Sequence, residues 1–564
     1  MNRGISMNIK HTYEQWLTHA LPAYQEELAS LDEAGVQERF YQTVPFGTGG
    51  MRGLLGAGTN RMNIHTIRLV AEGLAQQIEA QGEEAKVRGV VIAYDTRVMS
   101  TEFAYETAGV LAAHGIQSYV FTEARPTPEL SFAVRYLAAY AGVVITASHN
   151  PGQYNGFKVY GEDGAQLTPA FADAIVAKME AVPDLFAIPA LSKEELLASG
   201  YCTEILQKLD DAYARALQGL RMRADVKKDL AIVYTPLHGA GLVPTMRGLR
   251  AFGFTNVCEV PAQAVQDGAF PTVTYPNPEE AAAFEMAIAL GRDCGAELLL
   301  ATDPDADRLG VAVARDGDYT LLTGNQLGAL LLHYILKAKQ EQGVLPDNGV
   351  MVKTIVTSEF GRVIADHFGV ATENTLTGFK FIAERIAEWE KTGERSFLFG
   401  YEESYGYLAA DFVRDKDAVQ IALLTAEMAA YYKEQGMSLL DGLEALYEQF
   451  GYYGETLISL TFEGLEGQQK IGKIMETLRA SAPAQLAGLA VERVEDYLTE
   501  HVNGLPKADV LKWYLADGSW VCVRPSGTEP KCKFYIGVCA NHSGEKGEKL
   551  KILEQAIRDL VDKI

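Results

Sequence analysis

The hydrophobic pattern of the first 200 residues alternates short apolar runs with longer amphipathic segments. Val87–Arg97, Ile116–Phe121 and Ala138–Ser148 are rich in β-branched and aromatic residues, which predicts strands. Thr101–Gly115 has the spacing of an amphipathic helix, and residues 10–40 also follow a helical pattern. Strands that alternate with helices in this way favour parallel strands joined by crossover helices.

The same alternation restarts twice along the chain. Asp229–Gly239, Thr255–Val260 and Ala296–Asp303 predict a second set of strands. A long helix from Gly324, strands within Gly349–Ser358 and Ser396–Ser404, and a helix over Asp417–Tyr432 complete a third set. We therefore predict three tandem α/β domains with mixed or mostly parallel sheets, at residues 1–206, 207–322 and 323–452.

The pattern changes after about residue 450. Leu457–Phe462, Leu489–Leu498 and the pair Asp509–Gly518 and Ser519–Gly527 read as strands of an antiparallel sheet, with helices near 468–481 and over the last 22 residues. We predict a smaller α+β domain at residues 453–564. The full length of 564 residues exceeds what one hydrophobic core usually holds, so four domains arranged around a central cleft are expected.

Composition and charge narrow the class of partner. The chain is 48% hydrophobic and 22% charged, as is usual for a globular protein, and its formal net charge is −24. Such an excess of carboxylates argues against nucleic acid, although a few local cations can still bind one small phosphorylated substrate. No apolar run approaches the roughly 18–20 residues of a membrane span, and the N-terminal stretch has no secretory core. Six scattered cysteines form no CxxC pair, so we expect a cytoplasmic protein, with Cys294 as a core residue.

The first candidate for chemistry is TASHNP, Thr146–Pro151, directly after the apolar run AGVVI. Ligands bind at the carboxyl ends of parallel strands, which is where this placement puts Ser148. A serine becomes a useful nucleophile when polar neighbours assist it or its partner is an activated phosphoryl group, and His149 and Lys158 are near in sequence. A strand-ending turn stabilised by serine and asparagine is the alternative.

The second candidate is DPDADR, Asp303–Arg308, which again follows a buried-looking strand. Three carboxylates without histidine or cysteine select Mg²⁺ or Ca²⁺ over zinc. An EF-hand is excluded, because loop positions 6 and 12 hold Arg308 and Ala314 in place of the required glycine and glutamate. An acidic turn is the remaining alternative, but carboxylates this closely spaced repel one another without a cation.

Two further loops carry groups that suit a sugar phosphate. GYEESYGY, Gly400–Tyr407, offers Glu402, Glu403 and Ser404 to vicinal hydroxyls, or it is a solvated acidic turn. RPSGTEPK, Arg524–Lys531, combines an arginine, two hydroxyls and a glycine as a phosphate cradle, or it is an ordinary turn.

TASHNP, DPDADR, GYEES and RPSGTEP occur in this order, one in each predicted domain, and together they resemble the four signature loops of the α-D-phosphohexomutase superfamily. The resemblance covers nearly the whole chain. Length, the entry segment FGTGGMRG and the sugar loop are most similar to bacterial α-phosphoglucomutases. The resemblance implies interconversion of α-glucose 1-phosphate and glucose 6-phosphate through a phosphoserine and a glucose 1,6-bisphosphate intermediate, which also serves as activator. Phosphomannomutases, phosphopentomutases and glucose 1,6-bisphosphate synthases are relatives, so the preferred sugar stays open.

Matched residue by residue, the resemblance implies that Ser148 is the phosphoserine and that Asp303, Asp305 and Asp307 bind Mg²⁺, with the phosphoserine oxygen completing the metal shell. Arg308 would lie beside the transferred phosphate, and His149 and Lys158 would assist proton movement. The remaining matches imply active-site or substrate contacts at Thr48, Arg52, Thr377, Gly378, Lys380, Glu402, Ser404 and Lys416. Contacts to the phosphate that is not transferred are implied at Arg524, Ser526, Gly527 and Thr528.

One departure concerns the phosphate loop. Many relatives carry an arginine a few residues after it, where this chain has Lys533, which cannot form a bidentate clamp. Two other classes of function remain as alternatives: a sugar phosphatase, which needs no bisphosphate, and a binding protein without catalysis, which would not need Ser148 and every metal carboxylate. We expect a small phosphosugar substrate, no nucleic-acid or membrane partner, and a monomer or dimer.

Overall fold

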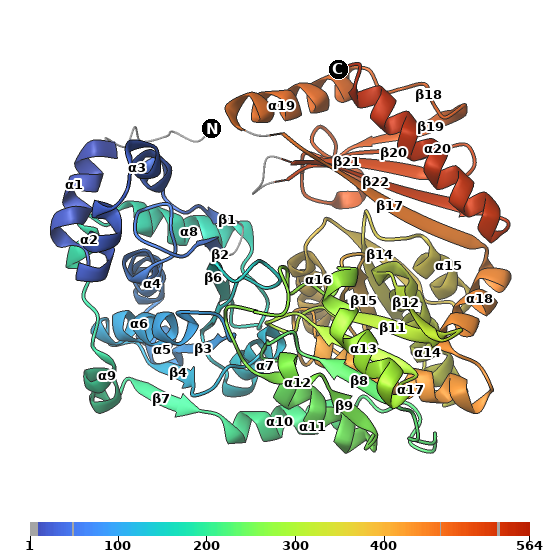
Figure 1. Cartoon of the computed structure of the whole chain (residues 1–564), viewed down its shortest axis with the longest axis horizontal. Coiled ribbons are helices and arrows are strands. Elements are labelled where there is room, and N and C mark those ends of the chain that lie inside the picture. Colours follow the sequence, from blue (N-terminus) through green and yellow to red (C-terminus); the bar gives the residue numbers. More distant parts are fainter. Residues whose placement is uncertain (1–8, 48–49, 463, 527–530) are drawn as a thin grey trace. The chain divides into compact units, whose positions relative to one another are not determined.

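The computed structural model describes residues 9–47, 50–462, 464–526 and 531–564. The chain forms two compact units. Figure 1 shows their helices and strands, coloured along the sequence. Unit 1 comprises Met1–Leu322, Ala383–Lys391 and Ser404–Tyr431, and unit 2 comprises Thr323–Ile382, Thr392–Glu403 and Tyr432–Ile564. The chain therefore passes between the units five times, all between residues 322 and 432.

Unit 1 begins with helices followed by an α/β layer structure. Its first elements are α1 (Ile9–His19), α2 (Pro22–Ala29), α3 (Glu33–Phe40), β1 (Phe46–Gly47), β2 (Gly50–Leu54), α4 (Ile64–Glu79), α5 (Glu83–Arg88), β3 (Val90–Tyr94), α6 (Ser100–Ala113), β4 (Ser118–Phe121), α7 (Thr127–Leu137), β5 (Ala141–Ile145), β6 (Tyr154–Tyr160), α8 (Pro169–Glu180), η1 (Leu185–Ala187), α9 (Lys193–Ser199), β7 (Cys202–Ile205) and α10 (Gln207–Gln218). The strand order is β1-β2-β6-β5-β3-β4-β7. Parallel pairing joins β5, β3, β4 and β7, and antiparallel pairing joins β5, β6, β2 and β1.

The central strands β3 and β5 are buried at every position because helices cover both faces of the sheet. Val90 and Ile92 belong to the core cluster that contains residues of α4, α6 and α8. Val91, one position along, belongs to the cluster that contains residues of α7 and α10. Alternate side chains thus enter opposite layers, which explains why these strands read as continuous apolar runs.

The second sheet of unit 1 has the order β12-β11-β10-β8-β9. Its elements are β8 (Ile232–Thr235), α11 (Leu242–Phe252), β9 (Val257–Glu259), α12 (Pro261–Ala264), η2 (Ala281–Phe284), α13 (Glu285–Cys294), β10 (Leu298–Thr302), β11 (Leu309–Arg315) and β12 (Asp318–Leu322). Strands β10, β8 and β9 are parallel, whereas β11 and β12 are antiparallel.

Unit 2 contains a parallel sheet ordered β14-β13-β15 and an antiparallel sheet ordered β17-β22-β21-β20-β19-β18. Its elements, with those that cross between the units, are α14 (Gly324–Glu341), β13 (Gly349–Thr354), α15 (Phe360–His367), β14 (Ala371–Thr375), α16 (Phe379–Thr392), β15 (Ser396–Glu402), β16 (Gly406–Leu408), α17 (Ala418–Glu434), α18 (Leu439–Phe450), β17 (Tyr452–Thr461), α19 (Gly464–Ala480), β18 (Gln485–Leu486), β19 (Leu489–Asp496), η3 (Val502–Gly504), β20 (Leu511–Leu515), β21 (Trp520–Pro525), β22 (Lys531–Ala540) and α20 (Ser543–Val561).

The fold class predicted from the sequence is confirmed, including the hairpin of β20 and β21 and the terminal helix α20. Strands β6, β11 and β12 were not among the expected elements, and they make the sheets mixed. The prediction for Cys294 is wrong: it is exposed, because it is the last residue of α13 and Gly295 turns the chain there in the left-handed conformation. The domain boundaries at residues 206, 322 and 452 stay predictions.

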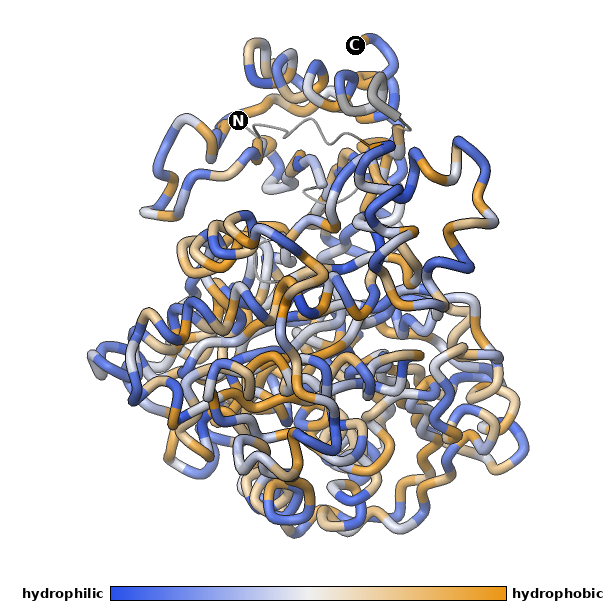
Figure 2. Tube along the Cα trace, turned by 90° about the vertical axis from the view of Figure 1, so that its left-hand side faces the viewer, coloured by the Kyte–Doolittle hydropathy of each residue, from blue (hydrophilic) through white to orange (hydrophobic). Residues whose placement is uncertain are grey.

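Hydrophilic and hydrophobic segments alternate along the trace in Figure 2. Within the described part of the chain, no helix is both long enough and apolar enough to span a membrane.

Candidate active site

Two loops of unit 1 meet at the carboxyl ends of their strands. Strand β5 ends at Ile145, and Ser148 follows three residues later; β10 ends at Thr302, and Asp303 follows directly. The Ser148 hydroxyl donates a 2.8 Å hydrogen bond to Oδ2 of Asp303, although the two residues are 155 positions apart in sequence. Both side chains are buried. The sequence-based expectation that the two loops lie at strand ends is therefore met by their geometry.

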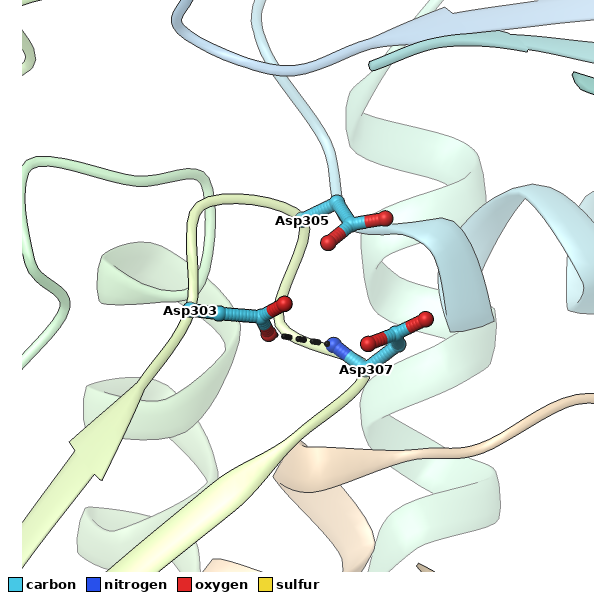
Figure 3. Close-up of side chains that lie close together, drawn as sticks. All are labelled: Asp303, Asp305 and Asp307. Atoms are coloured by element: carbon cyan, nitrogen blue, oxygen red, sulfur yellow. Dashed lines mark hydrogen bonds between the residues drawn. The ribbon is translucent and has the colours of Figure 1, made fainter. Parts of the chain in front are cut away.

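The carboxylates of Asp303, Asp305 and Asp307 point toward one another (Figure 3). One oxygen from each lies within 4.8 Å of the others, and all three residues are buried. The backbone amides of Asp307 and Arg308 donate to Oδ1 of Asp303 at 3.1 and 3.0 Å. These hydrogen bonds bend the loop back on itself, which brings its carboxylates close together as a cation-binding turn requires.

The electrostatics of the trio fit a hard divalent cation. Burial, followed by repulsion from Asp307 and Asp305, raises the pKa of Asp303 well above its usual value. Burial also opposes the charge of Asp305, but Lys158 outweighs it and lowers the pKa of that carboxyl. Among the described residues, Oδ1 of Asp305 and Oδ1 of Asp307 accept no hydrogen bond. Buried oxygens without donors, in a site without nitrogen or sulfur ligands, suit Mg²⁺ or Ca²⁺.

Three cations surround the trio. Lys158, on β6, places Nζ 3.0 Å from Oδ2 of Asp305, and Lys416 places Nζ 3.1 Å from Oδ2 of Asp307. Arg308 donates to the carbonyl of Ser404 at 2.9 Å and forms an ion pair with Glu279. The expected residues Lys158, Arg308, Ser404 and Lys416 are thus brought together around the carboxylates.

His149 and Arg52 both contact residues of the serine loop, Thr146–Pro151. Nδ1 of His149 is 3.2 Å from the Ser148 hydroxyl, and burial together with Arg308 and Arg52 lowers the histidine pKa well below its usual value. The imidazole is therefore neutral near pH 7 and can accept a proton. Arg52, on β2, donates to the side chain of Asn150 at 2.9 Å.

Ser148 itself has a left-handed backbone conformation, with φ of 51°. This conformation costs a residue other than glycine about 1–2 kcal/mol, so the surrounding structure must hold it. Such strain is common where a side chain has to be aimed at a reaction centre.

The predicted sugar-binding residues Thr377, Gly378, Lys380 and Glu402 lie in unit 2. Oε1 of Glu402 accepts a 3.0 Å hydrogen bond from the amide of Gly378. This bond connects the LTGFK loop, Leu376–Lys380, to the end of β15. Glu403 accepts from the hydroxyls of Thr354 and Thr357, so both glutamates are held by hydrogen bonds within unit 2.

The described residues of the predicted phosphate loop lie at the end of β21 and the start of β22 in unit 2. Arg524 and Lys533 are cross-strand partners, and the amide of Ser526 donates to the carbonyl of Lys531 at 2.8 Å. The remaining expected residues Thr48, Gly527 and Thr528 lie outside the described residues.

The structure adds site residues that the sequence reasoning missed. The Thr127 hydroxyl donates to Oδ2 of Asp305 at 2.8 Å, Asp415 accepts from Nζ of Lys416 at 2.9 Å, and Glu279 holds Arg308. None of them follows a strand end in a recognised motif, so only their spatial neighbours identify them. Together with Ser148, the arrangement brings a hydroxyl, a neutral imidazole and three carboxylates into one place, and these are groups that phosphoryl transfer can use.

Family models match most of the chain. They are described as phosphoglucomutase/phosphomannomutase, alpha/beta/alpha domain I at residues 43–184, domain II at 211–317, domain III at 323–450, and C-terminal domain at 474–553. They match in the order in which the motifs occur.

Known proteins resemble the chain along nearly its whole length. A phosphoglucomutase of Staphylococcus aureus (strain bovine RF122 / ET3-1) is 38% identical over 559 residues, covering 97% of this chain and 96% of that protein. The protein of strain MSSA476 is also 38% identical, over 96% and 98% of the two chains. A solved structure of a phosphoglucomutase/phosphomannomutase family protein from Burkholderia thailandensis has a TM-score of 0.66 at 19% identity, covering 91% and 97%. Parafusin, a phosphoglucomutase from Paramecium in an open form, has a TM-score of 0.69 at 17% identity, covering 92% and 94%.

Proposed function

The chain belongs to the phosphoglucomutase/phosphomannomutase family, and on that premise we propose that it interconverts α-glucose 1-phosphate and glucose 6-phosphate through phosphorylated Ser148. The observation that carries the proposal is the hydrogen bond between the Ser148 hydroxyl and Asp303 at the edge of the carboxylate trio. The named activity of relatives 38% identical over almost the whole chain supports glucose as the sugar.

In the first step, the phosphoryl group on Ser148 moves to the free hydroxyl of the sugar phosphate. The bond between phosphorus and Oγ breaks, a bond between phosphorus and the sugar oxygen forms, and the hydroxyl proton passes to a base. The neutral His149 accepts that proton, because its ring lies beside the serine hydroxyl. The Lys158 ammonium, which is paired with Asp305, assists by stabilising the negative charge that develops on the sugar oxygen. The product of this step is glucose 1,6-bisphosphate.

In the second step, the bisphosphate has turned over and its other phosphate returns to Oγ of Ser148. The sugar oxygen regains a proton, so the enzyme ends in its starting state and the phosphate has changed position. Added glucose 1,6-bisphosphate would act as activator by phosphorylating any free Ser148. Water must stay out of the site, since hydrolysis of the phosphoserine would make the enzyme a phosphatase.

The charge on the transferred group has to be neutralised. Asp303, Asp305 and Asp307 would hold Mg²⁺, which when bound supplies a Lewis acid for the phosphoryl oxygens. Glu279 and the Ser404 carbonyl hold the Arg308 guanidinium in place. Arg308 adds a second positive group that stabilises the charge on the transferred phosphoryl group.

The substrate needs recognition that tolerates both orientations of the sugar. We assign the vicinal hydroxyls to Glu402 and Ser404, assisted by the LTGFK loop residues Thr377, Gly378 and Lys380. The phosphate that is not transferred goes to the loop of Arg524, Ser526, Gly527 and Thr528, with Lys533 on the opposite strand. Thr48, Arg52 and Lys416 complete the proposed set of substrate contacts.

A comparison of sugar phosphates tests the proposal. Purified protein with Mg²⁺ is assayed on α-glucose 1-phosphate, mannose 1-phosphate and ribose 1-phosphate, with and without glucose 1,6-bisphosphate. Glucose 1-phosphate should give the highest kcat/KM, and Ser148→Ala should abolish both turnover and the phosphate found on the protein. A preference for ribose 1-phosphate would assign a phosphopentomutase instead. Release of inorganic phosphate without bisphosphate dependence would identify a phosphatase.

A further inference from the structure

Two buried, oppositely charged residues follow strand β3 beside the serine loop. Asp95 and Arg97 are 1% and 3% exposed, and Nε of Arg97 lies 3.2 Å from Oδ2 of Asp95. The proposed function gives neither residue a role. A buried ion pair adds little to stability on its own, so its other contacts should explain what it does.

The guanidinium of Arg97 binds four backbone carbonyls of the serine loop. One terminal nitrogen donates to Pro151 at 2.8 Å and Tyr154 at 3.0 Å. The other donates to the carbonyl of Ser148 at 2.5 Å and to that of Asn150. Only a planar fork with donors on both ends can reach so many acceptors from one side chain.

Asp95 is linked through Thr146 to the backbone amide of Ser148. Its Oδ2 accepts from the Thr146 hydroxyl at 2.7 Å, and the Thr146 oxygen accepts from the amide of Ser148 at 2.8 Å. Oδ1 accepts from the Arg97 amide and from the Ser100 hydroxyl, both at 2.9 Å. The peptide groups before and after Ser148 are therefore both fastened to one ion pair.

The loop between α12 and η2 packs against the pair. The ring of Phe270 lies 4.8 Å from the guanidinium carbon of Arg97. The ring therefore blocks movement of the guanidinium in that direction. A Cβ on Gly268 would come within 2.3 Å of the Val98 amide nitrogen, so the backbone segments touch here. Arg97 is thus fixed in the plane that matches the loop carbonyls.

We propose that Asp95 and Arg97 are positioning residues that hold Ser148 in its left-handed conformation and so aim its hydroxyl at Asp303. The inference deepens the proposed function and rests on it, because it assigns the cause of the nucleophile's position. A left-handed serine relaxes to a commoner conformation when its flanking peptides are released, and that rotation carries Oγ away from the carboxylates. The reacting Oγ is then misaligned, and phosphoryl transfer becomes slower.

Two substitutions release the serine in different ways. Arg97→Lys keeps the charge that pairs with Asp95 but loses the fork to the carbonyls. Thr146→Val keeps the volume and removes only the hydroxyl that links Asp95 to the Ser148 amide. Matched controls are Arg61→Lys, a buried arginine that pairs with Glu38 and binds one carbonyl, and Thr107→Val, a buried hydroxyl within α6.

Activity is the first measurement. Because a misplacement of about 1 Å can cost about 100-fold, Arg97→Lys should lower kcat by ~100-fold and Thr146→Val by ~10-fold. KM should stay within about threefold, since the substrate contacts are untouched, and both controls should remain near the wild type. A loss of the same size in Arg61→Lys, or wild-type kcat in Thr146→Val, overturns the proposal. Thr146→Val decides alone if Arg97→Lys does not fold.

The second measurement does not depend on the reaction. Hydrogen exchange of the amides of residues 147–154 is followed in dephosphorylated protein without substrate. Exchange should be faster in both variants than in their controls, while the rest of unit 1 stays protected. Unchanged exchange in both variants overturns the proposal even if the enzyme is a mutase. Faster exchange in a protein that proves to have no mutase activity would leave the positioning role standing and remove the proposed function.

Discussion

At the scale of single residues, the site is a concentration of buried charge that few other parts of a protein tolerate. Asp303, Asp305 and Asp307 are almost fully buried, and Lys158 and Lys416 balance part of their charge. Uncompensated buried charges cost several kcal/mol each, so the trio is stable only with cations close by. The lysines form ion pairs with Asp305 and Asp307. The Asp303 carboxyl group instead accepts hydrogen bonds from the Ser148 hydroxyl and from a backbone amide.

Replacing Asp305 tests the metal site at this scale. Asp305→Asn removes one anionic ligand and keeps the shape, so Mg²⁺ affinity, measured by calorimetric titration, should fall. Turnover should fall by at least ~100-fold, because changes at groups that merely support ligands already cost about 10–100-fold. Circular dichroism should show an unchanged fold. Asp316→Asn, in the exposed turn before β12, is the control and should bind Mg²⁺ normally. Full wild-type activity after exhaustive chelation would contradict a metal role.

At the scale of elements, one of the contacts that attach the N-terminal helices to α4 is made by an imidazole. His65, in the first turn of α4, accepts a 3.2 Å hydrogen bond from the amide of Leu21, which precedes α2. Its ring makes edge-to-face contacts with Trp16 and Phe186 at 5.3 and 5.1 Å. Nε2 can accept this hydrogen bond only when the imidazole is neutral. The contact between these helices and α4 therefore depends on the protonation state of His65.

The stability of this docking should depend on pH. Burial, and secondarily Arg68, lowers the pKa of His65 from 6.5 to about 4. The unfolded segment therefore binds more protons between these values, and stability present above pH 6.5 is lost as the pH falls toward 4. Hydrogen exchange of α1 and α2 amides, corrected for intrinsic rates, should show about 2 kcal/mol less protection at pH 5 than at pH 7.5.

Removing the imidazole should remove this difference. In His65→Gln the protection of α1 and α2 should be lower at pH 7.5 and nearly independent of pH. His19→Gln, at the exposed end of α1, serves as the control and should keep the wild-type dependence. An identical pH dependence in His65→Gln and the wild type would assign it to another group.

At the scale of the whole molecule, the two units divide the candidate site residues between them. Ser148, the metal carboxylates and Lys416 belong to unit 1, and Glu402 and Arg524 belong to unit 2. The sugar loop is itself divided, because the chain passes from unit 2 to unit 1 between Glu403 and Ser404. The proposed chemistry and the proposed substrate recognition are thus separable by mutation.

Arg524→Ala should separate them. A charge-assisted hydrogen bond contributes about 1.5–3 kcal/mol, so loss of this proposed phosphate contact should lower kcat/KM by at least ~10-fold. Part of the loss should appear in kcat, because remote binding energy is used for alignment. Phosphorylation of Ser148 by added bisphosphate should still be seen by mass spectrometry. Arg493→Ala, on β19 of the same sheet, is the control and should be silent; an unchanged kcat/KM in Arg524→Ala would exclude the contact.

Much of the fold and the centre of the site could be predicted without coordinates. The apolar runs before Ser148 and Asp303 predict parallel strands, and the carboxyl ends of such strands are where ligands bind, so local pattern and one topological rule sufficed. The spacing of Asp303, Asp305 and Asp307 predicts a group of carboxylates that could hold a cation, because neighbouring residues in a turn lie close together.

Other features were decided only by the tertiary structure. The contacts of Glu279 with Arg308 and of Lys416 with Asp307 join residues 29 and 109 positions apart, and no periodicity records which distant side chains will meet. Asp95 and Arg97 stand at a strand end like Ser148, yet only packing shows that they hold it. The sequence determined most of the elements and where their reactive ends lie, because propensity and hydrophobic pattern are local, but it did not reveal β6, β11 and β12. Close packing of the layers determined which of those ends meet and which side chains restrain the nucleophile, because that depends on the whole core at once.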